Sequence, residues 1–353
     1  MTAKMHLTSD TPEGEADECS RMAERFHQTG HVHVPVDFDG VARAYVFALV
    51  PNFSMHSFSA ALEPLRIANQ LAGQALFHWE TRSVDGKPVQ ASNGLSLSSD
   101  GTFTDLPKGA VVLACSGDNA QMHTPKPLSD WLRWAWRRGH IVGGVCTGAH
   151  ALCQAGLLSD HSFTLHWECQ PSFSELYPDL PLDPAAFVVD RRIVTSGGGV
   201  ASTDLMLHLI QKEFGRNLRY AVADMCLQLH VRGPQDMQRS AVAKAFGLQN
   251  PKLIRAIEFV QANLQGGFNV DDWAEHLAIS RRQLERLFKA HTGVTPKSFA
   301  QNLRLEHAYS LLVGTDLTLV EVAEATGFSS GNFSKVFKHR FGVQPRQLTR
   351  QIG

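Results

Sequence analysis

The 353-residue sequence lacks any apolar run near the roughly 20 residues that a membrane span needs. Its first 40 residues are polar and acidic, which differs from the basic and then apolar pattern of a secretory signal. Its six cysteines show no metal-ligand spacing, and a chain without an export signal is expected to keep them reduced. These absences predict a cytoplasmic protein with no membrane partner, no bound metal and no cofactor.

A large net charge is absent too, because the formal charge of the chain is −1. This balance conceals a division along the chain. Residues 250–353 hold 13 Lys and Arg against 9 Asp and Glu, a net of +4, whereas the preceding 249 residues hold 20 against 25, a net of −5. Since a basic segment attracts polyanions, the C-terminal part is the candidate for contact with nucleic acid.

A repeat with an offset of 49 residues is the clearest pattern in the sequence. It relates residues 273–296 to residues 322–345. The matched pairs are Ala274 and Ala323, Ser280 and Ser329, Leu284 and Phe333, Phe288 and Phe337, Lys289 and Lys338, Gly293 and Gly342, Val294 and Val343, and Pro296 and Pro345. Solvated charge runs rarely recur in register with the same serine and the same Gly-x-x-Pro ending, so the repeat indicates two copies of one structural unit.

Each copy has the spacing of a helix-turn-helix. In the first, Trp273 to Ala278 predicts a short helix, Ile279-Ser280 a turn, and Arg281 to Ala290 a second helix that Ser280 caps. The second copy has the same order. A helix with a basic and polar open face suits a major groove, and two of them about one turn of DNA apart (~34 Å) read successive grooves. The residues expected to meet DNA are Ser280, Arg281, Arg282, Gln283, Arg286, Ser330, Asn332, Lys335 and Lys338.

The segment 251–353 resembles the DNA-binding domain of the AraC/XylS family of transcription regulators. The resemblance rests on Gly327-Phe328-Ser329, Phe333, Phe337-Lys338, Phe341-Gly342 and Gln344-Pro345. It implies seven helices that start near Lys252, with a long helix from Pro296 to about Val313 between the two helix-turn-helix units. Thr318 is expected to cap the helix that follows. One departure is Gly331, early in the second recognition helix, where glycine costs roughly 1 kcal/mol relative to alanine.

From Ala44 to about Glu213 the pattern changes to apolar strands that alternate with helices. Strands are predicted at Tyr45 to Val50, Phe77 to Val84, Ala110 to Ala114, Ile141 to Val145 and Phe187 to Val189, and helices at Ala60 to Ala72, Ser129 to Arg137, Ala149 to Ala155 and Ser202 to Phe214. This alternation predicts an α/β domain of flavodoxin-like type, a parallel sheet with helices on both faces. Its ligand site is expected beyond the carboxyl ends of the strands.

Gly144-Val145-Cys146-Thr147-Gly148 places a cysteine at a strand-to-helix elbow. The glycines permit a sharp turn that raises the thiol above the sheet and leaves backbone N–H groups for an anion. With Ala155-Gly156-Leu157-Leu158 and Ser196-Gly197-Gly198-Gly199, this elbow resembles the ThiJ/PfpI branch of the class I glutamine amidotransferase-like fold. The expected ligand-binding residues are Glu63, Cys146, Thr147, His166, Trp167 and Asp204. Other roles are open for three of them: an ion pair with Arg66 for Glu63, a core position for Trp167, and a brace for the glycine turn for Asp204.

Binding is favoured over catalysis in this domain, and no catalytic residue is expected. A catalytic cysteine needs a base, and the base needs an acid that orients it. No acid occupies Ser54 to Ser59, where catalytic members of the superfamily carry one, and Thr147 stands where the peptidase-like members have His. Two alternatives stay open. One is a cysteine-dependent amidase or hydratase with an appended DNA-binding domain, and the other is a constitutive DNA-binding protein whose N-terminal domain only dimerises.

Joined in this order, the two halves resemble the AraC-family regulators with an amidotransferase-like N-terminal domain. Such regulators sense nitrogenous metabolites such as arginine, carnitine or glycine betaine and act chiefly as activators of catabolic operons. The resemblance implies double-stranded DNA and a small-molecule effector as partners. We expect a disordered segment at 1–40, a sensing and dimerisation domain at 41–216, a connecting helix and linker at 217–250, and the DNA-binding domain at 251–353. Twofold assembly is the commonest oligomer, so a homodimer is expected.

Overall fold

The computed structural model describes residues 32–228, 231–234, 236–238, 251–266 and 269–349. Most of the segment predicted to be disordered, and part of the predicted linker, lie outside these residues. The chain divides into two compact units, residues 1–155 with 191–233, and residues 156–190 with 234–353. This division does not follow the domain limits expected from the sequence, which stay predictions.

Six described strands form one sheet in the order β2-β1-β5-β6-β8-β7. They are β1 (Arg43–Leu49), β2 (Phe77–Arg82), β5 (Val111–Cys115), β6 (Ile141–Val145), β7 (Phe187–Asp190) and β8 (Ile193–Ser196). β1 pairs in parallel with β2 and β5, and β6 pairs in parallel with β5 and β8. The predicted parallel sheet is therefore confirmed for these five strands. Its four central strands are almost wholly buried, which explains why they read as continuous apolar runs in the sequence.

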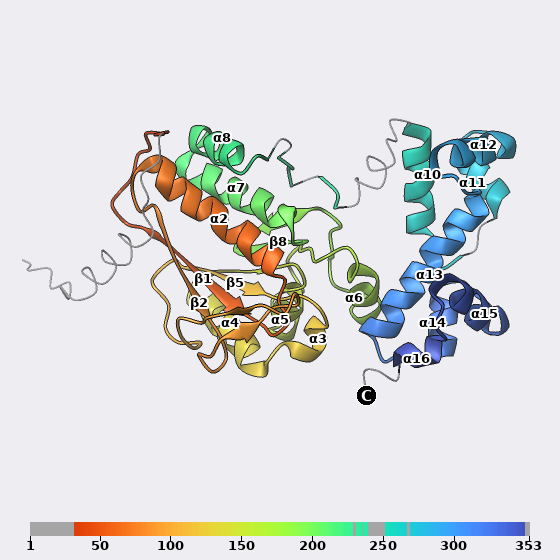
Figure 1. The fold of residues 1–353 in the computed structure, drawn as a ribbon, viewed down its shortest axis with the longest axis horizontal. Coiled ribbons are helices and arrows are strands. Elements are labelled where there is room, and N and C mark those ends of the chain that lie inside the picture. The colour runs from red at the N-terminus through yellow and green to blue at the C-terminus, as the bar shows by residue number, and fades with distance from the viewer. Residues whose placement is uncertain (1–31, 229–230, 235, 239–250, 267–268, 350–353) are drawn as a thin grey trace, which may run out of the picture. The chain divides into compact units, whose positions relative to one another are not determined.

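Helices cover both faces of this sheet, as Figure 1 shows for the first unit. α2 (Met55–Ala72), α7 (Val200–Phe214) and α8 (Arg216–Met225) pack together on one face. α4 (Lys126–Arg137) and α5 (Ala149–Gln154) pack against β6 on the other. Most bounds differ from the predicted ones by a few residues. α2 begins five residues earlier than predicted because Ser54 is its N-cap.

The sequence reading missed several short elements. β8 is four residues long, and the two-residue strands β3 (Val89–Gln90) and β4 (Ser96–Leu97) form a small antiparallel ribbon. α3 (Ala120–His123) and α6 (Gln170–Leu176) were also missed. Such elements are too short for a periodic pattern to show, so only their tertiary contacts define them.

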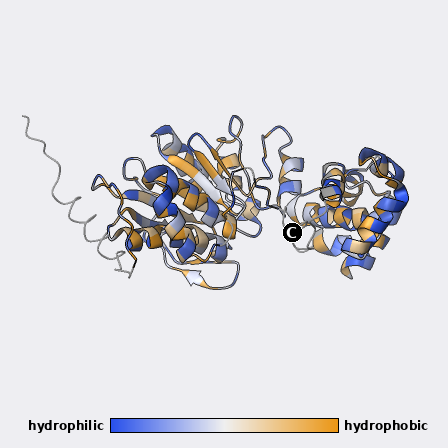
Figure 2. Cartoon of the chain, turned by 90° about the horizontal axis from the view of Figure 1, so that it is seen from above, coloured by the Kyte–Doolittle hydropathy of each residue, from blue (hydrophilic) through white to orange (hydrophobic). Residues whose placement is uncertain are grey.

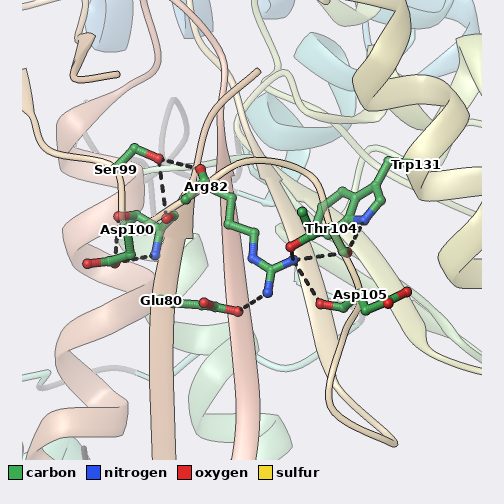
Figure 3. Close-up of polar contacts among 9 residues, drawn as sticks. Glu80, Arg82, Ser99, Asp100, Thr104, Asp105 and Trp131 are labelled. Carbon is green, nitrogen blue, oxygen red and sulfur yellow. Dashed lines mark hydrogen bonds and ion pairs between the residues drawn. The ribbon is translucent and has the colours of Figure 1, made fainter. Parts of the chain in front are cut away.

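A buried arginine fixes the loop that follows β2 (Figure 3). The Arg82 guanidinium points from β2 into this loop, where it donates to the carbonyl oxygens of Thr104 and Asp105, each over 3.0 Å. On its other side it pairs with Glu80 over 2.6 Å. Trp131 of α4 donates to the same Thr104 oxygen, over 2.8 Å. These contacts attach an irregular crossover to both a strand and a helix.

From Pro251 onward, the described residues form seven helices, the number that the family resemblance implies. They are α10 (Pro251–Ala262), α11 (Val270–His276), α12 (Arg281–Thr292), α13 (Pro296–Gly314), α14 (Leu319–Ala325), α15 (Ser330–Phe341) and α16 (Pro345–Thr349). Their outer faces carry many hydrophilic residues (Figure 2). No helix in the described residues combines the length and apolar character that a membrane crossing requires.

Two hydrophobic cores lie along α13, one for each copy of the repeat. Trp273, Leu284 and Phe288 belong to the first, and α13 adds Ala300. Phe333 and Phe337 belong to the second, to which α13 adds four residues from Leu305 to Leu312. Leu284, Phe288, Phe333 and Phe337, which the repeat matches in pairs, are therefore core residues, and the long helix contributes to both cores.

Candidate functional site

The first recognition helix, α12, begins at a reciprocal cap. The Ser280 hydroxyl accepts from the Gln283 backbone N–H over 3.2 Å, and the Gln283 side-chain oxygen accepts from the Ser280 N–H over 2.9 Å. This capping box satisfies two N–H groups that a helix start leaves without partners. Both residues were predicted to meet DNA, but in the structure their side chains cap the helix. The Ser280 O–H and the Gln283 amide nitrogen keep their donors for another partner.

The open face of α12 holds the three predicted arginines, all exposed. They are not equivalent. Arg281 lies 3.0 Å from Asp271 of α11 and 3.0 Å from Glu285 one turn further along α12. No ion pair is found for Arg282 or Arg286 within the described residues, so their guanidinium groups are the ones that face outward with full donor capacity.

The second recognition helix, α15, presents the predicted Asn332, Lys335 and Lys338 on its exposed side. Ser329 stands at its N-cap position, but within the described chain its side chain accepts no capping hydrogen bond. Ser329 therefore matches Ser280 in position but does not cap its helix as Ser280 does. Ser330 starts the helix, and its side chain lies outside what the structure describes. A Cβ at Gly331 would meet no heavy atom of the described residues within 4 Å, which leaves open space at this point.

The turn before α15 depends on a glycine. Gly327 has φ +70°, and a Cβ there would overlap the Gln265 carbonyl oxygen, so both backbone conformation and space require glycine. Gln265 follows α10, which packs in the first core. The glycine in the family signature therefore lets the second helix-turn-helix approach the chain that belongs to the first one.

The elbow lies at the carboxyl edge of the sheet, where four strands end side by side. The register places Leu49 beside Cys115, Cys115 beside Val145, and Val145 beside Ser196. Cys146 follows with φ +61°, a left-handed conformation that is uncommon for a residue with a side chain. A Cβ at Gly148 would overlap the Ala114 carbonyl oxygen, which explains the second glycine of the motif. The predicted elbow is therefore confirmed as a backbone feature.

Hydroxyl groups hold the loops around this elbow together. The Thr147 hydroxyl donates to the Gly117 carbonyl over 2.6 Å, which ties the elbow to the loop after β5. The Ser57 hydroxyl accepts from the Gly199 N–H over 2.8 Å, which ties α2 to the loop after β8. A Cβ at Gly198 would lie 2.7 Å from the Ser57 hydroxyl and 2.8 Å from the Cys146 Cβ, so this glycine leaves no space for a side chain between α2 and the elbow.

Sequence reasoning missed Ser57, which lies nearest the elbow on α2. It also missed the contact between the Asn52 amide, in the loop after β1, and His123, at the end of α3, over 3.2 Å. One signal was present in the sequence. The stretch Ser54 to Ser59 contains no acid, and Ser57 supplies a hydroxyl there.

His166 and Trp167 lie on one loop after β6 and α5. The His166 ring packs against the Trp167 indole with centroids 5.4 Å apart, and its Nδ1 lies 3.8 Å from the Glu168 carboxylate. Trp167 is 38% exposed, so it is no core residue. An exposed indole beside an imidazole suits an organic cation, which the face of an aromatic ring attracts.

Glu63 takes the structural role that had been left open for it, and Asp204 takes a different one. Glu63 pairs with Arg66 over 2.7 Å, about two helical turns from the start of α2. Asp204 is fully buried in α7, where its Oδ1 accepts from the Gln228 amide over 3.1 Å and from the Arg232 N–H over 3.0 Å. Asp204 therefore braces the chain after α8 rather than the glycine turn.

Comparison with known proteins agrees with both halves of this geometry. The family model of a helix-turn-helix domain matches residues 273–351, and that of the DJ-1/PfpI family matches residues 55–212. The HTH-type transcriptional regulator GbdR of Pseudomonas aeruginosa is 38% identical over 85% of this chain and 82% of its own length. This chain belongs to the AraC-type transcription regulators that carry a DJ-1/PfpI domain.

Two further members of this family cover the same two-domain arrangement. The HTH-type transcriptional regulator CdhR of Pseudomonas aeruginosa is 39% identical over 87% of this chain and 91% of its own length. The regulator GlxA of Rhizobium meliloti is 36% identical over 87% of this chain and 95% of its own. DNA is thus a partner of this regulator, and α12 and α15 are the helices that its fold offers to the major groove.

Proposed function

We propose that this regulator activates catabolic genes in response to a nitrogenous metabolite, of the amino acid, betaine or carnitine class, which binds at the Cys146 elbow without being turned over. One observation carries the proposal. The Ser57 hydroxyl and the Cys146 Cβ both lie close to Gly198, and Ser57 belongs to the stretch Ser54 to Ser59, where catalytic members of the superfamily carry an acid. A hydroxyl has no charge at neutral pH with which to orient a base, so Ser57 favours binding at the elbow over catalysis.

The rigidity of the elbow supports a sensing role. Thr147 and Ser57 link the loops after β5, β6, β1 and β8 by hydrogen bonds of 2.6 and 2.8 Å. Loops held in this way need little ordering when a ligand arrives, so less of the binding energy is spent on immobilising them. Trp167 and His166 are the proposed contacts for a cationic part of the effector, and Glu63 and Asp204 are retained as weaker candidates.

The oligomeric state and compartment follow from the same proposal. One chain covers one site with two unlike recognition helices, so a repeated operator needs two chains, and we propose a cytoplasmic homodimer formed by the N-terminal domain. Size-exclusion chromatography with light scattering on the full chain tests this. A monomer at micromolar concentration, with full operator binding, would contradict it.

The test of the sensing role is a thermal-shift screen of the full chain against amino acids, betaines and polyamines. A ligand that binds only the folded form at 100 times its Kd adds about 2.7 kcal/mol of stability, which is a measurable shift in Tm. The Cys146→Ala variant should keep the shift and keep effector-dependent transcription in a reporter strain. If no compound shifts Tm or changes transcription, the domain serves dimerisation only and the DNA binding is constitutive.

The second candidate, a cysteine-dependent amidase or hydratase, is favoured by the backbone of Cys146. A left-handed φ of +61° at a residue after a strand is the strained geometry of nucleophile elbows. The discriminating measurement is turnover of amide and isocyanide substrates by the wild type and by Cys146→Ser. Turnover that disappears in Cys146→Ser, together with loss of induction in Cys146→Ala at unchanged folding, would favour the enzyme.

A further inference from the structure

Gln238 makes an unusual number of contacts for a residue beyond the last helix of the sensing domain. Its side-chain oxygen accepts from the Trp167 backbone N–H over 2.9 Å. Its side-chain nitrogen lies 2.9 Å from the Thr164 hydroxyl, 2.8 Å from the Leu165 carbonyl and 2.9 Å from the Ala185 carbonyl. One side chain thus joins the segment that leads to the DNA-binding domain to the loop that carries Trp167.

The orientation of this amide is fixed by its surroundings. The nitrogen has two hydrogens and faces three acceptors, while the oxygen faces a single N–H donor. If the amide were turned over, its oxygen would meet two carbonyl oxygens and its nitrogen would meet the Trp167 N–H. The observed orientation places the donors of the amide against acceptors and its acceptor against a donor, which the reversed orientation does not.

The backbone on both sides of Gln238 is docked as well. Met237 forms an antiparallel bridge with Ala185, the Asp236 carbonyl accepts from the Ala186 N–H over 2.6 Å, and the Gln238 N–H donates to the Pro184 carbonyl over 3.2 Å. Residues 236–238 are therefore held by an isolated β-bridge and two backbone hydrogen bonds beside residues 184–186, which lead into β7. Thr164 joins the same group, since its hydroxyl donates to the Ala185 carbonyl over 3.0 Å.

We propose that Gln238 is a positioning residue that couples the Trp167 loop to the linker of the DNA-binding domain. Residues 164–167 and 236–238 form a latch that opens as one unit, because both segments share the same amide. A change at the loop then alters the linker, and a change at the linker alters the loop, with equal coupling in both directions. The role of the latch in regulation rests on the proposed effector site. The coupling between the two segments does not depend on that site.

The coupling is tested by limited trypsin digestion of the full chain, in which the rate of cleavage after Arg239 is followed by mass spectrometry. When opening is fast compared with cleavage, this rate reports the population of the open latch. Gln238→Ala and Thr164→Val should each raise the rate about tenfold, since each removes hydrogen bonds on which the docked state depends. The double variant should cleave no faster than the faster single variant.

Three further variants separate a latch from a general loss of structure. Thr164→Ser keeps the hydroxyl and should cleave at the wild-type rate. Gln238→Glu keeps the shape and the acceptor for Trp167 but places an oxygen against two carbonyls, so it should cleave at least as fast as Gln238→Ala. Gln90→Ala, on the exposed ribbon β3, is the matched control and should leave the rate unchanged.

In a reporter strain, with glycine betaine, carnitine and arginine as probes, Gln238→Ala should lower the ratio of transcription with and without a probe at least threefold. Binding to the operator should stay within twofold of the wild type. If Thr164→Val leaves the linker at the wild-type cleavage rate, or if the single effects multiply in the double variant, the two segments are independent and the proposal is overturned. An unchanged ratio in Gln238→Ala overturns its regulatory use. If no probe changes wild-type transcription, the effector proposal fails, and the cleavage rates still decide the coupling.

Discussion

The Arg281 guanidinium lies 3.0 Å from the Asp271 carboxylate, and this ion pair links the two helices of the first helix-turn-helix. Glu285 holds the same guanidinium from the other side. Arginine pairs with guanine through the same forked donors that these two carboxylates occupy. The structure therefore gives Arg281 a link within the protein, and Arg282 and Arg286 stay the arginines that we expect to meet DNA.

Arg282→Ala should cost about 1–3 kcal/mol in affinity for the cognate operator and should relax discrimination at particular base pairs. Arg281→Ala should have a smaller effect on base discrimination, because its donors are already bound to two carboxylates. The measurement is a set of binding titrations with operator duplexes that carry single base-pair changes. Equal loss of discrimination in the two variants would mean that Arg281 exchanges its carboxylates for bases.

Lys338→Ala should weaken binding about equally to cognate and scrambled duplexes. Lysine meets DNA phosphates as a point charge, so its loss should reduce the slope of log K against log salt by about one. Titrations at four salt concentrations measure the slope. Asn332→Ala on the same helix is the matched comparison, since it should lose cognate affinity with the slope unchanged. A sequence-dependent loss in Lys338→Ala would instead place this lysine on a base.

His150, in the helix that follows the elbow, should make folding sensitive to acid. Burial lowers the pKa of this histidine to about 4. Between that value and about 6.5 the unfolded chain binds a proton that the folded chain does not, so stability is complete above the higher value and falls as the pH falls. This site should remove about 2 kcal/mol between pH 7.5 and pH 5. Urea unfolding of wild type and His150→Gln at both values checks it, and identical pH dependence would contradict it.

Arg82→Ala should destabilise the N-terminal domain by about 3 kcal/mol, because it leaves carbonyl groups and Glu80 without their buried donor. The control is Lys87→Ala, which breaks an exposed ion pair with Asp85 and should change stability by less than about 0.5 kcal/mol. Thermal unfolding of both variants gives the comparison. A loss below 1 kcal/mol in Arg82→Ala would show that water replaces the guanidinium in this loop.

The elements with strong local signals could be predicted from the sequence. Ser280 and Thr318 cap their helices as expected, because a capping box involves only four consecutive residues and can be recognised from them. The inward faces of α12 and α15 followed from helical periodicity, the bridging α13 followed from the family resemblance, and the parallel strands followed from short apolar runs between helices. The elbow at Cys146 was visible because a cysteine between two glycines directly after a strand indicates a sharp turn.

Contacts between distant segments could not be predicted in this way. Nothing near Asp204 in the sequence indicates that it accepts from Gln228 and Arg232, and nothing near Gln238 indicates four partners in two other segments. Ser329 matched Ser280 by position, yet only Ser280 has a glutamine three residues later to complete a reciprocal cap. Side-chain roles of this kind depend on the fold, because the fold brings together residues that lie far apart in the sequence. A periodic pattern describes only residues within one helix or strand.

The length of α13 has a consequence for the operator. A 19-residue α-helix spans about 28 Å, and the cores that seat α12 and α15 lie toward its two ends. A continuous helix cannot stretch or twist to follow a longer spacer, so the two base-pair clusters read by one chain must keep a fixed separation and a fixed rotational phase on the duplex. Operators in which half a helical turn is inserted between these clusters should hold only one recognition helix at a time, and the protein should lose the contacts of the other entirely.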